Sequence, residues 1–375
     1  MIDTTILSIP KDKITMYEMS DMEISGWNLQ SQTSAYSKFV RNPSKRDMES
    51  GLYFPRLTGI RRRNNKMEWD SHVKIEFSAP KLLYKNNMDE LEDSQFGEVV
   101  SCLKDRLFRM GLSVEDKDLV GAEVRAVHYS KNIELKNGYT SQYVIGELNK
   151  INLNKRFDLT RARYMNDGQS LYAYTQSHSL VIYDKIADLI RGKKRSIDKE
   201  QSAYQMSLFE PLAKRSEPLE ILRIEARLSQ KRKMNSIFKK LGFTENPTFK
   251  DAFSTKISQA VVWDYWETML STNMALLFAH SLSSKDLLKQ VLVTDKKLKA
   301  KEVIYRAGLM WLVQEGNGMR ELRSILSKRA NDRTWYRIAT DARNTGTALS
   351  KLKPREWCDQ IIRALKTYKP VHISS

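Results

Sequence analysis

The sequence contains little cysteine, no long apolar run and no glycine-rich loop of the kind that binds ATP. Its 375 residues include only two cysteines, Cys102 and Cys358, which lie far apart. This scarcity argues against a disulfide framework or a cysteine-based metal site, and predicts a reducing, cytoplasmic environment. No apolar stretch reaches the roughly 20 residues that cross a bilayer. The first residues, MIDTTILSIPKDK, lack the basic and apolar regions of a secretion signal.

Negative charge is scarce relative to positive charge. The 63 lysines and arginines outnumber the 45 aspartates and glutamates, which leaves a formal net charge of +18. A surplus of this size attracts polyanions and speeds encounters with them, so we expect a nucleic-acid partner. The alternative is a soluble protein that is simply basic. The cations gather at residues 61–66, 191–195 and 231–233, and no apolar anchor or lipidation motif beside them indicates a membrane surface.

The strand and helix signals change along the chain. Up to about residue 245, strand-like and helical segments alternate, whereas helical periodicity dominates from about residue 250 onwards. Together with the length, this change predicts an α+β domain at residues 1–245 and a mainly helical domain at residues 246–375. Within the first domain we expect strands at 72–77, 121–129, 171–185 and 220–228, and helices at 97–110, 141–150, 199–213 and 231–241.

Near the C-terminus, residues 319–327 and 333–343 predict two helices separated by a short turn. Trp335, Ile338, Ala339 and Ala342 fall on one face of the second helix, while Arg333, Tyr336 and Arg337 lie off it. A helix, a turn and a basic amphipathic helix are typical of a helix-turn-helix DNA reader. Two ordinary packed helices give the same pattern, so both interpretations remain open.

The segment EILRIEARL, residues 220–228, carries the clearest chemical signal. Its alternation places Arg223, Glu225 and Arg227 on one face of a strand. Glu225 can offer an oxygen to Mg²⁺ or Mn²⁺, and the two arginines can hold phosphate oxygens. A solvated strand face whose charges neutralise one another is the equally simple alternative.

A nucleophile is harder to choose, because most of the 16 tyrosines must be packing residues. Tyr204 lies in a polar segment that follows the basic run 191–195. Neighbouring cations favour a phenolate and stabilise a pentacovalent phosphorus, as a transesterifying tyrosine requires. The alternative is that Tyr204 packs at an interface. The histidines near predicted strands, His72, His128 and His178, have ordinary core or surface roles as their simplest interpretation.

Five segments resemble the filamentous-phage gene II replication endonucleases and related plasmid replication initiators. They keep the family's order and spacing between about residues 70 and 345, and ILRIEARL, followed by a basic helix and Leu-Gly, is the nearest match. The resemblance implies an antiparallel-sheet, HUH-like nuclease domain followed by the helical domain. The matching segments are HVKIEFSAPKLLYKNNMDEL (72–91), VRAVHYS (124–130), SLVIYDK (179–185), SAYQMSLFEPL (202–212) and ILRIEARL (221–228).

The resemblance also implies an activity. Enzymes of this family nick one origin strand through a tyrosine that becomes joined to the 5′ phosphate, prime rolling-circle synthesis from the 3′ hydroxyl, and later rejoin the strand. It maps the nucleophile onto Tyr204, with Tyr183 as the rival, makes Glu225 and Arg227 the acidic and basic pair, and gives Lys185 the task of neutralising the scissile phosphate. The DNA contacts would come from Arg223, Arg227, Lys231, Arg232, Arg333 and Arg337.

A divalent ion, Mg²⁺ or Mn²⁺, belongs to this chemistry. By strand position its expected ligands are Glu76, His128 and Glu225. The phage relatives carry an aspartate at the position of His128, and imidazole also binds Mn²⁺. The alignment at Glu76 can shift by two residues onto Lys74, in which case His178 is the substitute ligand.

The expected partners are origin DNA, single-stranded or melted at the nick, and a host helicase and polymerase. Three alternatives remain: a non-catalytic origin-binding initiator, a relaxase or transposase of the same chemistry, and an RNA-binding protein. A pure binder would explain the charge, but it would leave the joint match at Lys185, Tyr204 and Glu225 unexplained.

Overall fold

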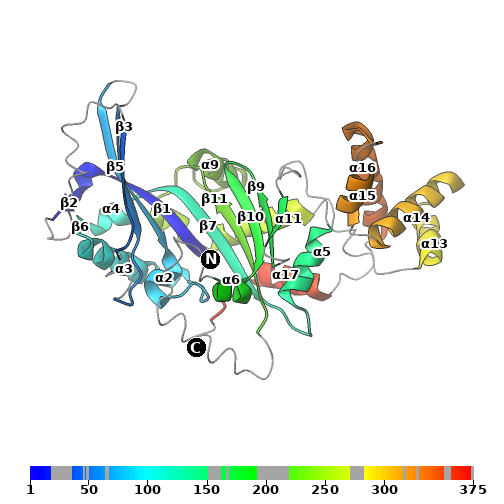
Figure 1. Cartoon of the computed structure of the whole chain (residues 1–375), viewed down its shortest axis with the longest axis horizontal. Helices are drawn as coiled ribbons and strands as arrows, with labels where there is room; N and C mark the ends of the chain where they lie inside the picture. Colours follow the sequence, from blue (N-terminus) through cyan, green and yellow to red (C-terminus); the bar gives the residue numbers. More distant parts are fainter. Residues whose placement is uncertain are drawn as a thin grey trace.

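The computed structural model describes residues 1–17, 36–44, 47, 50–63, 67–150, 162–165, 169–191, 219–270, 283–315, 318–326, 329–349 and 356–372. A nine-stranded sheet forms its centre, and every pair of neighbouring strands is antiparallel (Figure 1). The predicted α+β class is therefore confirmed. In spatial order the strands are β3 (Tyr36–Arg41), β4 (Arg56–Arg63), β5 (Trp69–Ser78), β1 (Ile2–Pro10), β7 (Glu123–Glu134), β11 (Ile221–Leu228), β10 (His178–Asp184), β9 (Ser170–Tyr174) and β8 (Ala162–Met165).

The helices predicted at 97–110, 141–150 and 231–241 correspond to α3, α5 and α9, and the structure adds a small second sheet that was not predicted. The sheet pairs β2 (Ile14–Met16) with β6 (Leu112–Val114). The segment 171–185 forms two strands, β9 and β10, and the first residue of a helix, because the chain turns where Thr175 N donates to the His178 carbonyl (2.9 Å). The helices are α2 (Ala79–Tyr84), α3 (Phe96–Arg109), α4 (Asp116–Val120), α5 (Ser141–Asn149), α6 (Lys185–Arg191), α9 (Lys231–Lys240), α10 (Phe249–Ala252), α11 (Thr255–Leu270), α13 (Ser284–Thr294), α14 (Ala300–Glu315), α15 (Gly318–Leu326), α16 (Asp332–Leu349) and α17 (Glu356–Thr367).

Alternation along the central strands gives the sheet two different faces. On β11, Leu222, Ile224, Ala226 and Leu228 are fully buried in the main apolar core. The residues between them point the opposite way, because successive strand side chains alternate. We call this second side the polar face; on β7 and β11 it carries His128, Ser130, Arg223, Glu225 and Arg227.

Helices supply the other half of the core. The ring of Phe238 in α9 stacks on Tyr129 of β7, and Phe249 of α10 meets Phe77 of β5 edge-on. Trp266 in α11 and Trp357 in α17 are fully buried in the same core. Residues on both sides of position 245 therefore share this core, because α10, α11 and α17 pack with the sheet. Three separate apolar clusters join α13–α16 to one another.

The predicted pair of C-terminal helices corresponds to α15 and α16. Trp335 and Ala342 of α16 are buried in one apolar cluster, with Ile338 and Ala339 packed against it, so the predicted apolar face is confirmed. Helices α13–α16 gather beyond the α5 end of the sheet (Figure 1). Within the described part of the chain, no helix has the length and apolar character needed to cross a bilayer.

Candidate active site on the polar face

Side chains from three neighbouring strands surround the carboxylate of Glu225, which is only 2% exposed. Arg227, on the same strand, donates from Nε to Oε1 (2.9 Å) and from Nη2 to Oε2 (3.1 Å). From β10, the hydroxyl of Tyr183 donates to Oε2 (3.3 Å). From β7, Nδ1 of His128 lies 3.3 Å from Oε1. The structure therefore brings together His128, Glu225 and Arg227 of the predicted site, together with Tyr183.

These contacts fix the charge state of the acid. Burial opposes ionisation of Glu225, but the guanidinium of Arg227 and the imidazole of His128 outweigh it and hold the pKa of Glu225 well below its usual range. Burial also acts against the charge of Arg227, yet the carboxylate raises its pKa. Burial raises the pKa of Tyr183 well above its usual value, which keeps its phenol protonated. Glu225 is thus a fixed negative charge with a half-buried imidazole at its side.

Arg223 resembles Arg227 in sequence but occupies a different environment. Its guanidinium is buried and donates to Ser130 Oγ (3.0 Å) and to the carbonyl of Asn87 (3.0 Å), and it lies 3.6 Å from Asp3. These contacts join β11 to β7, to β1 and to the loop after α2. Arg223 therefore supports the site from inside and does not present its guanidinium to solvent.

Lys185 is the most unusual cation of the site. It is fully buried at the start of α6, and its Nζ has no hydrogen-bond partner among the described residues. The carboxylate of Asp188 is 3.8 Å away, and the ring of Tyr183 is 5.7 Å from Nζ. Burial, and then the charge of Arg223, lower the pKa of Lys185 to about 8. A buried ammonium without a hydrogen bond is costly, and an anion such as phosphate would satisfy it.

Glu76 and His178 lie away from Glu225. Strand β1 separates β5, which carries Glu76, from β7, and Ile6 is opposite both Glu76 and Ala126. With neighbouring strands about 4.8 Å apart, Glu76 is roughly 10 Å or more from the strand of His128. His178 is opposite Leu228, on the helical side of the sheet, where Nδ1 is 2.8 Å from the Tyr265 hydroxyl.

The donor set for a cation therefore consists of His128 and Glu225. Over the residues that the structure describes, no three histidine, cysteine, aspartate or glutamate side chains come together as metal ligands. One imidazole nitrogen and a carboxylate still fit Mg²⁺ or Mn²⁺, because these ions commonly take few protein ligands and complete their shell with water and substrate phosphate. The two hydrogen bonds from Arg227 would compete with the ion for both oxygens of the carboxylate.

Two tyrosines that the sequence analysis did not select lie beside this group. Tyr172 and Tyr174 of β9 stack with ring centroids 4.9 Å apart and an interplanar angle of 15°. Tyr172 is opposite Val181 of β10, which is opposite Glu225, so both tyrosines belong to the polar face. Their i, i+2 spacing in the strand-like segment LYAY is the signal that could have revealed them.

The other predicted residues fall outside this cluster. Tyr204 and the helix predicted at 199–213 lie outside the described residues. Lys231 forms an ion pair with Glu123. Arg333 and Arg337 are exposed on α16.

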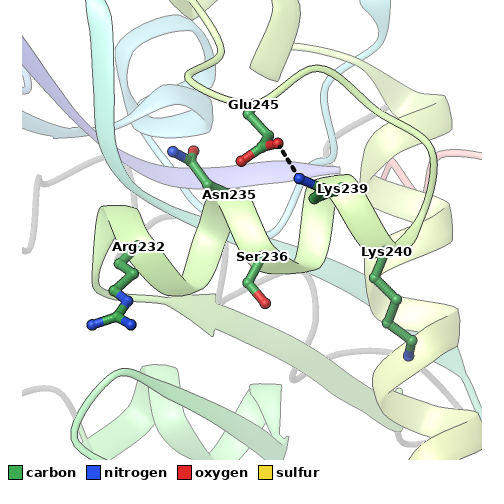
Figure 2. A pocket seen from close by; sticks show the side chains of 6 residues that line it. All are labelled: Arg232, Asn235, Ser236, Lys239, Lys240 and Glu245. Atoms are coloured by element: carbon green, nitrogen blue, oxygen red, sulfur yellow. Dashed lines mark ion pairs between the residues drawn. The ribbon is translucent and has the colours of Figure 1, made fainter.

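Arg232 lines a pocket of about 480 Å³ along α9. In Figure 2, Arg232, Ser236 and Lys240 lie along one side of this helix, and Lys239 lies on the other beside Glu245. Lys239 pairs with Glu245 (3.1 Å), and Lys240 pairs with Asp264. The pocket is therefore basic, but two of its three cations are already neutralised by carboxylates.

In comparisons with known proteins, no family model, no curated protein and no solved structure matches the chain.

Proposed function

We propose that this chain is a metal-dependent tyrosine endonuclease and strand transferase that nicks and rejoins one DNA strand at a replication origin, and that its sheet is of the HUH-like nuclease type. The single observation that carries the proposal is the contact of His128 with Glu225 across β7 and β11, with Arg227 on the same carboxylate. An ionised acid, an imidazole and a guanidinium at one point are suited to phosphodiester chemistry.

In the proposed reaction, the phenolic oxygen of Tyr204 attacks the scissile phosphorus and gives up its proton. A bond forms between that oxygen and phosphorus, and the bond from phosphorus to the 3′ oxygen breaks. The 3′ oxygen takes up a proton and leaves as a hydroxyl. Attack of a 3′ hydroxyl on the phosphotyrosine reverses these steps, so rejoining requires no ATP.

His128 and Glu225 would hold the divalent ion, which supplies positive charge to a nonbridging phosphate oxygen. Lys185 would provide a second positive charge, since its buried Nζ has no hydrogen-bond partner within the described part of the chain and an arriving phosphate would supply one. Tyr183 suits a positioning role, because its hydroxyl donates to Glu225 and burial keeps it protonated. For the same reasons Tyr183 is a poor nucleophile compared with a phenol that can ionise.

The stacked tyrosines support a single-stranded substrate. Aromatic rings that accept nucleobases are a common device for binding single strands, and each stacked base contributes about 1–3 kcal/mol. Tyr172 and Tyr174 are half-buried, two strands away from Glu225. We propose that they hold a base next to the scissile phosphate.

The test uses the full chain with Mn²⁺ and a 3′-labelled pool of randomised single-stranded DNA. The proposal expects a labelled protein band that resists denaturant, since the 3′ fragment stays joined to the tyrosine. Tyr204→Phe should abolish this band. Tyr183→Phe should retain it, as should Tyr143→Phe, which changes an exposed residue of α5.

A labelled band that survives in Tyr204→Phe would exclude Tyr204 as the nucleophile.

A non-catalytic origin-binding initiator is the second candidate, and the net charge of +18 favours it equally. It predicts that supercoiled plasmid stays closed at every Mn²⁺ concentration while DNA is bound. A relaxase or transposase would also form the band, and mapping of the cut sequence separates these enzymes from an origin nickase.

A further inference from the structure

Cations from four strands gather on the polar face beside the candidate active site. In β5, Val73, Ile75 and Phe77 are buried in the main core, so Lys74 points to the polar face. Burial, and then the charges of three neighbouring cations, lower the pKa of Lys74. We call these four residues the basic cluster: Lys38 of β3, Arg62 of β4, Lys74 of β5 and Arg125 of β7.

Two members of the basic cluster have carboxylate partners. The β4 arginine pairs with Asp70 (3.0 Å), and the β7 arginine pairs with Glu123 (2.9 Å). Ser8 of β1 is opposite both Lys74 and Glu123, which places the second pair on the face of Lys74. Among the described residues, no carboxylate forms an ion pair with Lys74, which is half-buried, or with Lys38, which is exposed. The cluster therefore retains two positive charges that the described chain does not pair.

A β-bulge adds Arg125 to this group. Ile6 of β1 is opposite Ala126 of β7, and Leu7 is opposite Val124, so Arg125 is the extra residue between them. Bulges are common next to active sites, where they change the direction of a side chain. Nε of Arg125 is buried and has no hydrogen-bond partner in the described part of the chain. The guanidinium is thus positioned by its ion pair and retains an unused donor.

The basic cluster and the stacked tyrosines lie on opposite sides of Glu225. Strands β1 and β7 separate β5, which carries Lys74, from β11, and β10 separates β11 from β9, which carries Tyr172. With neighbouring strands about 4.8 Å apart, β5 is roughly 14 Å from β11 on one side, and β9 is roughly 10 Å from it on the other. A ligand that reaches both sides needs a row of negative charges and accessible aromatic faces.

These two requirements select a single strand of nucleic acid. An unpaired strand offers phosphates to cations and bases to aromatic rings at the same time. In a duplex the bases are enclosed in the stack and must be extruded before they meet a side chain. An anionic membrane surface offers no bases at all.

We infer that the basic cluster binds the phosphates of single-stranded DNA that extends from Glu225 across β7, β1 and β5 towards β3. The choice of DNA rests on the proposed function, whereas the binding itself requires no cleavage. Lys38 and Lys74 supply the two unpaired charges, and the side of the face with Tyr172 receives bases.

The test measures the affinity of the full chain for labelled oligothymidylate in the absence of divalent ions, over a series of salt concentrations. Lys38→Gln/Lys74→Gln should weaken binding about fivefold near physiological salt and reduce the slope of log affinity against log salt by about 1.4, because each phosphate contact of a single strand contributes about 0.7. The control, Lys250→Gln/Lys256→Gln, removes two exposed charges of α10 and α11 on the helical side of the sheet and should leave both quantities near wild type.

A lysine-acetylation footprint of the wild-type chain adds a measurement that needs no variant. Bound oligothymidylate should protect Lys38 and Lys74 and leave Lys250 and Lys256 reactive. Unchanged reactivity of Lys38 and Lys74 would overturn the inference. Equal losses of affinity in the variant and its control would also overturn it, as would an equal loss for a DNA duplex or a loss confined to oligouridylate.

This test and the test of nicking fail independently. At saturating DNA and Mn²⁺, Lys38→Gln/Lys74→Gln should still form the labelled adduct, because the cluster lies outside the reacting group. A chain that forms no adduct but loses affinity in this variant would refute the proposed nicking and support the inferred binding. A chain that forms the adduct but keeps full affinity in this variant would refute the binding alone.

Discussion

Nδ1 of His128 and Oε1 of Glu225 lie 3.3 Å apart on neighbouring strands, β7 and β11. Their strand register places His128 opposite Arg227 and Ser130 opposite Glu225, so the imidazole approaches the carboxylate diagonally. Arg227 donates to both oxygens of the same carboxylate. The imidazole and the guanidinium thus share one buried acid, and removal of that acid affects both.

Glu225→Gln should abolish nicking and destabilise the fold. The amide cannot neutralise Arg227, which would be left partly buried beside a neutral group. Breaking a fully buried pair costs about 3–5 kcal/mol, and because the Arg227 side chain is 34% exposed we expect about 1–3 kcal/mol. Denaturant unfolding measures this loss.

The control is Glu123→Gln, at the start of β7, whose carboxylate pairs with Arg125 and Lys231 at the surface. It should cost less than about 1 kcal/mol and retain nicking. Equal destabilisation by the two variants would mean that the Glu225 carboxylate contributes no more to stability than a carboxylate in a surface ion pair.

Mn²⁺ should raise the melting temperature of the wild-type chain in the absence of DNA. A ligand that binds only the folded state stabilises it by mass action, by about 2.7 kcal/mol at one hundred times its dissociation constant. His128→Ala should greatly reduce this gain, whereas Glu76→Gln should leave it unchanged, since β1 lies between β5 and β7. A gain that disappears in Glu76→Gln and survives in His128→Ala would exclude the proposed ligand pair.

Local sequence patterns predicted β5, β7, β9, β10 and β11, but they did not predict β1, β3, β4 and β8 or the pairing that builds the site. The alternation in 220–228 correctly placed Arg223, Glu225 and Arg227 on one face of β11. Nothing in that pattern distinguishes Arg223 from Arg227, because their difference in burial comes from Asp3, Asn87 and Ser130, which are remote in sequence.

Two further differences between the sequence-based prediction and the structure also arise from non-local packing. Glu76 lies on a strand, as predicted, but β1 pairs between β5 and β7 and so separates Glu76 from His128 by one additional strand. The change to helical periodicity near residue 250 was real, yet Trp357 of α17 returns to the core of the sheet. Such contacts depend on the assembled topology, which periodicity does not encode.

Tyr172→Leu should weaken the binding of single-stranded DNA while leaving duplex binding intact. Loss of one stacking ring costs about 1–3 kcal/mol, equivalent to roughly five- to 150-fold in affinity. Tyr172→Phe retains the ring and should bind nearly as wild type does. Fluorescence quenching of a 2-aminopurine oligonucleotide reports stacking directly, and unchanged quenching in Tyr172→Leu would exclude this base site.

Lys185→Met should stabilise the folded chain below pH 8. The pKa of Lys185 falls from 10.5 to about 8 on folding, first because of burial and then because of Arg223. Between these two values the unfolded chain binds more protons than the folded chain, so this lysine makes stability rise with pH. Below pH 8 both states are protonated and the cost of burying the charge is complete, at about 3 kcal/mol. The variant should therefore be more stable by about that amount at pH 7 and should lose its advantage as the pH approaches 10.5.

Urea unfolding at a series of pH values measures the difference between Lys185→Met and wild type. Lys104→Met, an exposed lysine paired with Asp116, provides the matched control and should show no such trend. A stability difference that stays constant from pH 7 to pH 10 would mean that Lys185 does not titrate in the folded chain near pH 8. If the difference varies with pH as expected, nicking should still fall in the more stable Lys185→Met variant. The positive charge of Lys185 would in that case reduce the stability of the fold and contribute to phosphate binding.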